Sequence, residues 1–261
     1  MVYMADSKTY FLFYSAVQTE PEHAPDVISR LALATTRNPR DINAWIKWGP
    51  IIENNSTGPG YAWSKSGALL AETDGNPSLL IFGDSSIENG LQTAQPSSDF
   101  LGYTYNSSIF LEIRSDSFDS LLVEAGPPPI VLSNGLIFFF YNSARLGYPS
   151  AKPGWNTQYN IGFLLLDPTN PTSVLYRTDV PIMSPELGWE QGTAPFLGLT
   201  PNVVFVEGAR MDDAPPAGSK GAAADRIVFW YGAADSCVGM GSITIEFQAL
   251  GDKPEVKVAL E

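Results

Sequence analysis

The chain is 261 residues long and strongly acidic, with 28 aspartates and glutamates against 15 lysines and arginines. Its net charge of −13 argues against nucleic acids and anionic membranes as partners, because both are bound through cationic patches. With one cysteine (Cys237) and one histidine (His23), the chain can form neither an internal disulfide nor a histidine-rich metal site. Catalysis is therefore expected to rely on carboxylates, without a metal. No apolar run approaches the roughly 20 residues of a membrane-spanning helix.

One type of strand recurs along the chain at long and fairly even intervals. Each copy is a short apolar run that contains aromatic residues, and small or polar residues follow most of the copies. Four copies are found, at residues 8–16, 77–84, 135–144 and 226–235. Repetition of one strand type at such a spacing is typical of radial or stacked repeat proteins.

A second strand is expected after each of these aromatic strands. We place these second strands at residues 30–36, 101–105, 159–167 and 237–245, with further short elements at 48–52 and 180–185. Several antiparallel strands in a recurring order indicate a propeller blade, whereas the strands of a β-sandwich need not repeat their order. The sequence thus predicts an all-β propeller domain over residues 1–246 and a C-terminal tail over 247–261, which can add an edge strand at 256–258.

Candidate site residues lie at the ends of equivalent strands, and radial symmetry would bring their side chains to one central depression. The residues in question are Asp84, Glu124, Asn142 and Asp235. Glu124 precedes a Gly-Pro-Pro-Pro turn that stiffens the backbone, so it is the first candidate for a general base. The alternative is a surface carboxylate beside a rigid turn. Asp84 is either a partner carboxylate or sugar ligand, or simply a turn aspartate.

Several segments, in this order, resemble glycoside hydrolase family 130. They include the Glu-Ala-Gly-Pro-Pro-Pro-Ile run at 124–130, the strand at 159–168, Leu-Tyr-Arg at 175–177, Pro-Ile-Met-Ser-Pro-Glu at 181–186, Trp-Glu-Gln-Gly at 189–192, Pro-Asn-Val-Val-Phe at 201–205 and Tyr-Gly-Ala-Ala-Asp at 231–235. The resemblance extends from about residue 5 to residue 245. It implies a five-bladed β-propeller of β-mannoside phosphorylases and β-mannosidases, akin to arabinanases, levansucrases and invertases.

The resemblance also implies a reaction, the inverting cleavage of β-mannosidic bonds. The family's general acid is an aspartate in an Asp-Pro-Arg motif before the strand matched by residues 10–14. The matched part begins after that motif, so we expect the chain to lack the family's general acid and to form an incomplete ring of about four blades. Phosphorolytic members hold phosphate with basic side chains, whereas Gly83-Asp84 stands at that place here. Hydrolysis is therefore slightly favoured. Inorganic phosphate is the co-substrate if the chain is a phosphorylase.

The resemblance assigns roles to further residues. Asp235 would bind hydroxyls of a mannose unit, and Lys65 matches a lysine near the phosphate or the reactive sugar. Other substrate-binding candidates are Asn142, Arg145, Glu190 and Tyr231. We expect Arg177 to pair structurally with a carboxylate. Two other classes remain open: an inactive propeller that binds glycans or proteins, and a related furanosidase such as an arabinanase-like enzyme. The sequence determines neither oligomeric state nor compartment, cytoplasmic or secreted.

Overall fold

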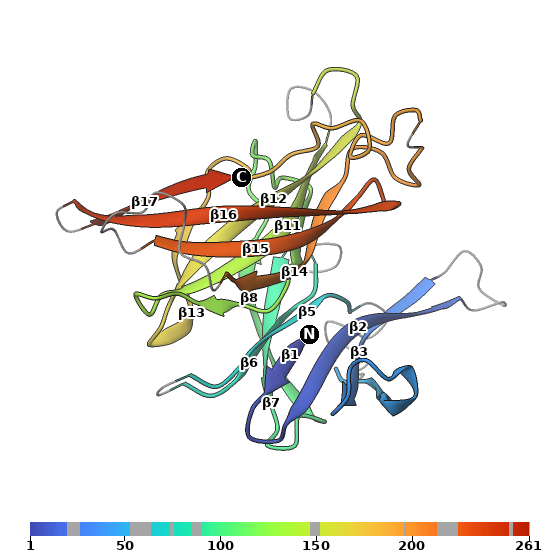
Figure 1. Cartoon of the computed structure of the whole chain (residues 1–261), viewed down its shortest axis with the longest axis vertical. Helices are drawn as coiled ribbons and strands as arrows, with labels where there is room; N and C mark the ends of the chain where they lie inside the picture. The colour runs from blue at the N-terminus through green and yellow to red at the C-terminus, as the bar shows by residue number, and fades with distance from the viewer. Residues whose placement is uncertain are drawn as a thin grey trace. The chain divides into compact units, whose positions relative to one another are not determined.

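The computed structural model describes residues 1–19, 27–52, 64–73, 76–84, 90–146, 152–195, 197–212, 224–250 and 253–260. Within these ranges the regular structure is β throughout, apart from one 3₁₀ turn at Ile42–Ala44 (Figure 1). The chain divides into two compact units. Unit 1 comprises Met1–Ser115 and Leu121–Pro128, and unit 2 comprises Asp116–Ser120 and Pro129–Glu261.

Unit 1 contains two antiparallel sheets of four strands each. The first sheet runs in the order β1 (Val2–Met4), β2 (Thr9–Thr19), β3 (Val27–Thr36), β4 (Ile46–Pro50). The second runs β5 (Gly67–Leu70), β6 (Leu79–Phe82), β7 (Gly90–Pro96), β8 (Tyr103–Glu112). Strand β9 (Leu122–Ala125) approaches the second sheet through a single bridge between Asp84 and Glu124. Both sheets contribute to one apolar core that includes Leu31, Leu80 and Phe82.

Unit 2 repeats this arrangement with two further antiparallel sheets. The order in one is β10 (Ile130–Val131), β11 (Ile137–Leu146), β12 (Thr157–Asp167), β13 (Asn170–Arg177). The other is β14 (Val204–Met211), β15 (Ala224–Ala233), β16 (Cys237–Leu250), β17 (Lys253–Leu260). Their shared core is rich in aromatics, with Phe140 lying 5.3 Å from Phe229 between ring centroids. Strand β17 pairs with β16 at the edge of its sheet, within the segment expected as a tail.

Glycines in the second strand of a hairpin lie under aromatic rings of the first. Tyr141 is the cross-strand partner of Gly162, and Phe229 is the partner of Gly241. A Cβ atom on Gly162 would come within 2.5 Å of the Tyr141 ring, and one on Gly241 within 2.8 Å of the Phe229 ring. A glycine inside a strand often marks such a close approach. The aromatic strands and the glycines that follow them in the sequence are therefore one structural feature.

Two predicted elements were wrong. In the second sheet, the strand that pairs with the aromatic strand β6 is β7, and residues 101–105 contribute only to the later strand β8. In unit 2, residues 180–185 form just an isolated bridge between Met183 and Ile161, and the outer strand is β13. Prolines 181 and 185 lack the N–H donor that a strand ladder needs, which explains the second error.

The predicted fold class is confirmed. The chain is all-β, and the described residues form four blade-like antiparallel sheets, one around each of the four aromatic strands found in the sequence. Among the described residues, no helix is long and apolar enough to span a membrane.

Candidate active site

Three predicted site residues of unit 1 meet in a buried cluster. The ammonium of Lys65 lies 3.0 Å from Asp84 Oδ2 and 3.0 Å from Glu124 Oε2. The hydroxyl of Ser66 donates a hydrogen bond to the other Glu124 oxygen, Oε1. Asp84 and Glu124 are 5% and 4% exposed, whereas the Lys65 side chain is 25% exposed. The cluster therefore holds two nearly buried carboxylates and a cation that reaches solvent.

The local backbone explains how these residues meet. Lys65 and Ser66 directly precede β5, and Ser66 has a left-handed φ of 51°. Asp84 follows β6 after Gly83, whose φ of 92° favours glycine. The Gly83 N–H donates to the carbonyls of Lys65 and Ser66 at 2.9 and 3.1 Å, and its own carbonyl accepts from Ala125 N–H at 3.3 Å. The backbone hydrogen bonds of Gly83 therefore join the start of β5, the end of β6 and the end of β9.

Burial and charge act in opposite directions on the protonation of this cluster. Burial raises the pKa of Glu124 most strongly, and the charge of Lys65 and the hydrogen bond from Ser66 lower it in part, so that the pKa stays above its usual value. For Lys65, burial lowers the pKa, but attraction to Glu124 and Asp84 outweighs burial and leaves the pKa raised. A carboxyl with a raised pKa beside a solvent-reaching cation suits general acid–base chemistry.

The two carboxylates share one ammonium, which limits the distance between their nearest oxygens. Both lie 3.0 Å from the same nitrogen, so those two oxygens are at most about 6 Å apart, with the ammonium between them. An inverting glycosidase needs roughly 6.5–9.5 Å between its acid and its base, with room for water. Asp84 is thus placed as a charge partner of Lys65.

Asn142 and Arg145 lie on β11 of unit 2. The Asn142 side chain is fully buried, and it donates to Val206 O at 3.0 Å and accepts from Val206 N–H at 2.7 Å. This amide joins β11 to β14, which favours a positioning role over contact with a ligand. Arg145 donates from Nη2 to Gln158 Oε1 at 3.0 Å and borders a cavity of 280 Å³.

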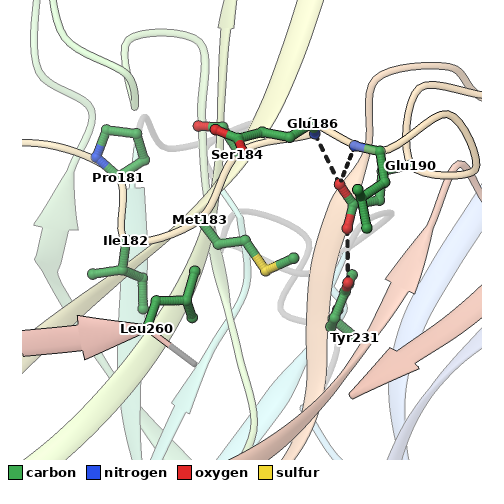
Figure 2. Close-up of a pocket in the computed structure, with 9 residues that line it drawn as sticks. Pro181, Ile182, Met183, Ser184, Glu186, Glu190, Tyr231 and Leu260 are labelled. Carbon is green, nitrogen blue, oxygen red and sulfur yellow. Dashed lines mark hydrogen bonds between the residues drawn. The ribbon is translucent and has the colours of Figure 1, made fainter. Parts of the chain in front are cut away.

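Glu190 and Tyr231 meet at a second cavity of unit 2, whose volume is 330 Å³. As Figure 2 shows, the Tyr231 hydroxyl points up to Glu190 and donates to its Oε1 at 2.7 Å. The other oxygen, Oε2, accepts from the N–H groups of Glu186 and Leu187 at 2.8 and 2.9 Å. Burial and the hydrogen bond to Glu190 raise the pKa of Tyr231. Both carboxylate oxygens are thus engaged in holding the loop 186–190, and Trp189 stacks on Tyr231.

Asp235 is exposed in the tight turn between β15 and β16, with a φ of 51°. This exposed position is compatible with sugar binding and also with a purely structural role in the turn. Asp235 and Asn142 belong to unit 2, whereas Asp84 and Glu124 belong to unit 1, so their expected convergence stays a prediction. His23 lies outside the described residues.

Sequence reasoning missed Ser66 and part of a buried network in unit 2. Arg177 pairs with Asp119 at 2.5 Å, which confirms the expected structural ion pair. The Tyr141 hydroxyl donates to the same Asp119 oxygen at 2.9 Å. Asp119 stands in the irregular segment 113–121, where no periodic pattern marks a buried carboxylate. For Ser66, its position next to Lys65 was the only available signal.

These observations define a class of protein: an all-β protein of blade-like sheets whose buried carboxylates suit glycoside chemistry. The chain belongs to glycoside hydrolase family 130, because the family model described as beta-1,4-mannooligosaccharide phosphorylase matches residues 5–248.

Two curated relatives come from Thermoanaerobacter sp. (strain X514). A 1,2-beta-oligomannan phosphorylase is 29% identical over 189 residues, which cover 70% of this chain and 55% of that protein. A beta-1,2-mannobiose phosphorylase is 31% identical over 133 residues, covering 51% of this chain and 35% of that protein. The first match thus spans about half of the relative's own length. Both relatives are phosphorylases, so they do not support the slight preference for hydrolysis drawn from the sequence.

Solved structures match most of the chain. A glycosyl hydrolase from Bacteroides ovatus is 25% identical with a TM-score of 0.67, covering 91% of this chain and 62% of that chain. Another structure, 27% identical with a TM-score of 0.67, covers 90% of this chain and 61% of that chain. This structure represents a family of mannoside phosphorylases that contains glycoside hydrolases targeting β-1,2 mannosidic linkages in Candida mannan.

Proposed function

We propose that this chain takes part in the cleavage of β-linked mannosides, with Glu124 as the group that activates the attacking nucleophile. Family membership supports the reaction class. The observation that carries the assignment is the buried Glu124 carboxyl, which Lys65 and Ser66 hold from either side. A base needs a fixed orientation and a pKa nearer to neutrality than that of a free carboxylate, and Glu124 has both.

Water is the first candidate for the nucleophile. The cluster carries two carboxylates against one ammonium, so it is negative while both carboxylates are ionised. A phosphate ion beside it would be repelled, because phosphate sites rely on cationic and N–H donors. A neutral water or sugar hydroxyl meets no such repulsion.

Phosphate is the second candidate, and the curated relatives favour it, because both of them are mannoside phosphorylases. In that reaction Lys65 would contact the phosphate, since its side chain reaches solvent. Asp84 would then only orient the lysine.

The two nucleophiles give different products. β-1,2-Mannobiose and β-1,4-mannobiose are incubated with the protein, with and without phosphate, and the products are followed by NMR. Hydrolysis gives mannose in both conditions, and phosphorolysis gives mannose 1-phosphate only with phosphate. The α-anomer as the first product indicates inversion. If neither disaccharide is cleaved, with or without phosphate, the proposal is contradicted.

Glu124→Gln tests the assigned residue. Loss of a general base is expected to lower kcat by roughly 10²–10⁴-fold. The matched control is Glu72→Gln, which changes an exposed glutamate of the same unit. If the two variants are equally active, Glu124 takes no part in the reaction.

A further inference from the structure

Ser66 contacts three other parts of unit 1 at once. Its N–H donates to Ser15 Oγ at 3.4 Å, and its carbonyl accepts from the Gly83 N–H at 3.1 Å. Its hydroxyl donates to Oε1 of Glu124. These partners stand on or beside the strands β2, β6 and β9. The backbone of Ser66 is therefore held by two strands, while its side chain binds the proposed base on a third.

The backbone of Ser66 has a conformation that serine rarely adopts. Its φ of 51° lies in the left-handed region. This region is unfavourable for residues that carry a Cβ atom, and glycine populates it readily. Among the other residues, asparagine, aspartate and histidine are the ones enriched there. Backbone outliers of this kind gather at functional sites, and what glycine would lack at this position is the hydroxyl that binds Glu124.

Lys65 and Ser66 hold different oxygens of Glu124. The lysine ammonium lies 3.0 Å from Oε2, at the end of a flexible four-carbon stem on a side chain that is 25% exposed. The serine hydroxyl is attached directly to Cβ, on a backbone that is fixed by its own hydrogen bonds. The lysine thus supplies charge, whereas the serine fixes the direction of the carboxylate.

We propose that Ser66 is a positioning residue, held in an unfavourable backbone conformation so that its hydroxyl aims the Glu124 carboxylate at the nucleophile. This inference rests on the proposed role of Glu124. A general base must lie within hydrogen-bond reach of the proton that it removes, so its orientation matters. An ionised carboxylate has about four lone-pair sites, and one contact to each oxygen leaves further sites for that proton.

The same hydroxyl acts on the protonation of Glu124. Burial raises the pKa of Glu124, the charge of Lys65 and the hydrogen bond from Ser66 lower it, and the charge of Asp84 raises it. Of the strands of unit 1 packed against β9, β6 and β7 carry no titratable side chain. Loss of the hydroxyl therefore raises the pKa of Glu124 further. A base acts in its ionised form, so the acidic limb of the pH profile of kcat moves to higher pH.

Ser66→Gly tests the hydroxyl, because glycine suits the left-handed backbone. For mannobiose cleavage, kcat should fall roughly tenfold, since one hydrogen bond to a charged group is lost, and the acidic limb should move to higher pH. Lys8→Gly is the matched control, because Lys8 also has a φ of 51° in unit 1 but is exposed in the turn after β1. An unchanged kcat in Ser66→Gly overturns the inference. A lower kcat without movement of the limb indicates a structural role only and also overturns it.

Ser66→Ala separates the hydroxyl from the backbone conformation. This variant lacks the hydroxyl but keeps a Cβ atom in the left-handed region, so it should unfold at a lower temperature than Ser66→Gly. Its acidic limb should nevertheless move as far as that of the glycine variant. If the limbs of the two variants differ, the backbone and not the hydroxyl controls Glu124, and the inference fails.

Titration of the Glu124 carboxyl by ¹³C NMR gives a readout that does not depend on cleavage. Glu124→Gln identifies the signal by its loss. The pKa of Glu124 should be higher in Ser66→Gly than in the natural chain, and unchanged in Lys8→Gly. If the natural chain cleaves mannobiose but Glu124 titrates identically in both variants, this inference alone fails. If the natural chain cleaves no mannoside, the proposed function fails, and the titration still decides whether Ser66 acts on Glu124.

Discussion

At the scale of single residues, Lys65 controls the candidate site. It is the shared partner of two carboxylates that are both almost fully buried. Asp84 and Glu124 each raise its pKa, and it lowers the pKa of Glu124 in return. A change at Lys65 therefore alters the protonation of the proposed base as well as the stability of the fold.

Lys65→Met should destabilise the protein by about 3 kcal/mol at pH 8, the lower end for a broken buried ion pair, because the lysine is partly exposed. The variant leaves two carboxylates together, so the pKa of Glu124 rises further. A carboxyl whose folded pKa is raised stabilises the fold at low pH and loses that contribution as the pH increases. The loss at pH 5 should therefore be smaller, as measured by urea unfolding. Lys47→Met, at an exposed lysine of β4, is the control, and a loss of equal size at both pH values contradicts the expectation.

Tyr141 gives a separate prediction at alkaline pH. Burial, and next the charge of Asp119, raises the pKa of Tyr141 to about 12. The unfolded tyrosine ionises near pH 10, so the folded form holds its proton longer and the free energy of unfolding falls as the pH increases from 10. Tyr141→Phe lacks this effect. Its free energy of unfolding should decline by about 1 kcal/mol less than that of the natural chain between pH 10 and pH 11. Identical declines would show that Tyr141 ionises normally.

Some site residues could be predicted from the sequence and others could not. Asp84 and Glu124 were found because each stands next to a strand end or a proline turn, whereas Lys65 was found through the family resemblance, and the structure brings these three together. Ser66 and Asp119 were missed, because a hydroxyl or carboxylate in an irregular segment carries no periodic signal of burial. The contacts of Asn142 and Glu190 also depend on tertiary partners, namely Val206 and Tyr231.

At the scale of strands and sheets, aromatic rings of one hairpin strand pack closely over glycines of the paired strand. Tyr141 covers Gly162, Phe229 covers Gly241, and Tyr231 would meet a Cβ on Gly239 at 2.4 Å. Glycine alone weakens a strand, but a ring packed over it covers the bare backbone. The strand that follows each of these aromatic strands therefore contains glycine in its interior.

Gly162→Ala tests this pairing. The added methyl group would collide with the Tyr141 ring, which is fully buried and bonded to Asp119. Overpacking of this kind should lower the free energy of unfolding by about 1–3 kcal/mol. Gly208→Ala is the matched control in the same unit, because its Cβ would stand 3.7 Å from Trp230 in ordinary contact. Equal stability of both variants, measured by urea unfolding, would show that the ring moves freely.

The strands that sequence reasoning missed have compositions that are unusual for strands. In β7, Gln92 and Thr93 are both only 4% exposed, so a polar segment forms an inner strand. In β13, Asn170 and Pro171 begin a strand with residues that are rare in strands. The apolar aromatic strands were predictable because their hydrophobicity agrees with their burial. The polar strands are placed by their neighbours in the sheet.

At the scale of the whole chain, the even spacing of the four aromatic strands predicted four sheets but not their grouping into two units. The grouping follows from the cores. In unit 1 the core includes Leu31, Leu80 and Phe82, and in unit 2 it includes Phe138, Phe163 and Phe229. A repeated strand looks alike in every sheet, so the sequence does not reveal which sheets share a core.

Two cores predict two unfolding steps in differential scanning calorimetry. Lys65→Met acts in unit 1 and Gly162→Ala acts in unit 2, so each variant should lower the midpoint of a different transition. A loss of 1 kcal/mol corresponds to roughly 4 °C for units of this size. The double variant should show both shifts with little interaction, since the two sites share no partner in the described contacts. If one transition responds to both single variants, the two cores unfold as one cooperative body, and the division into units describes packing without separate stability.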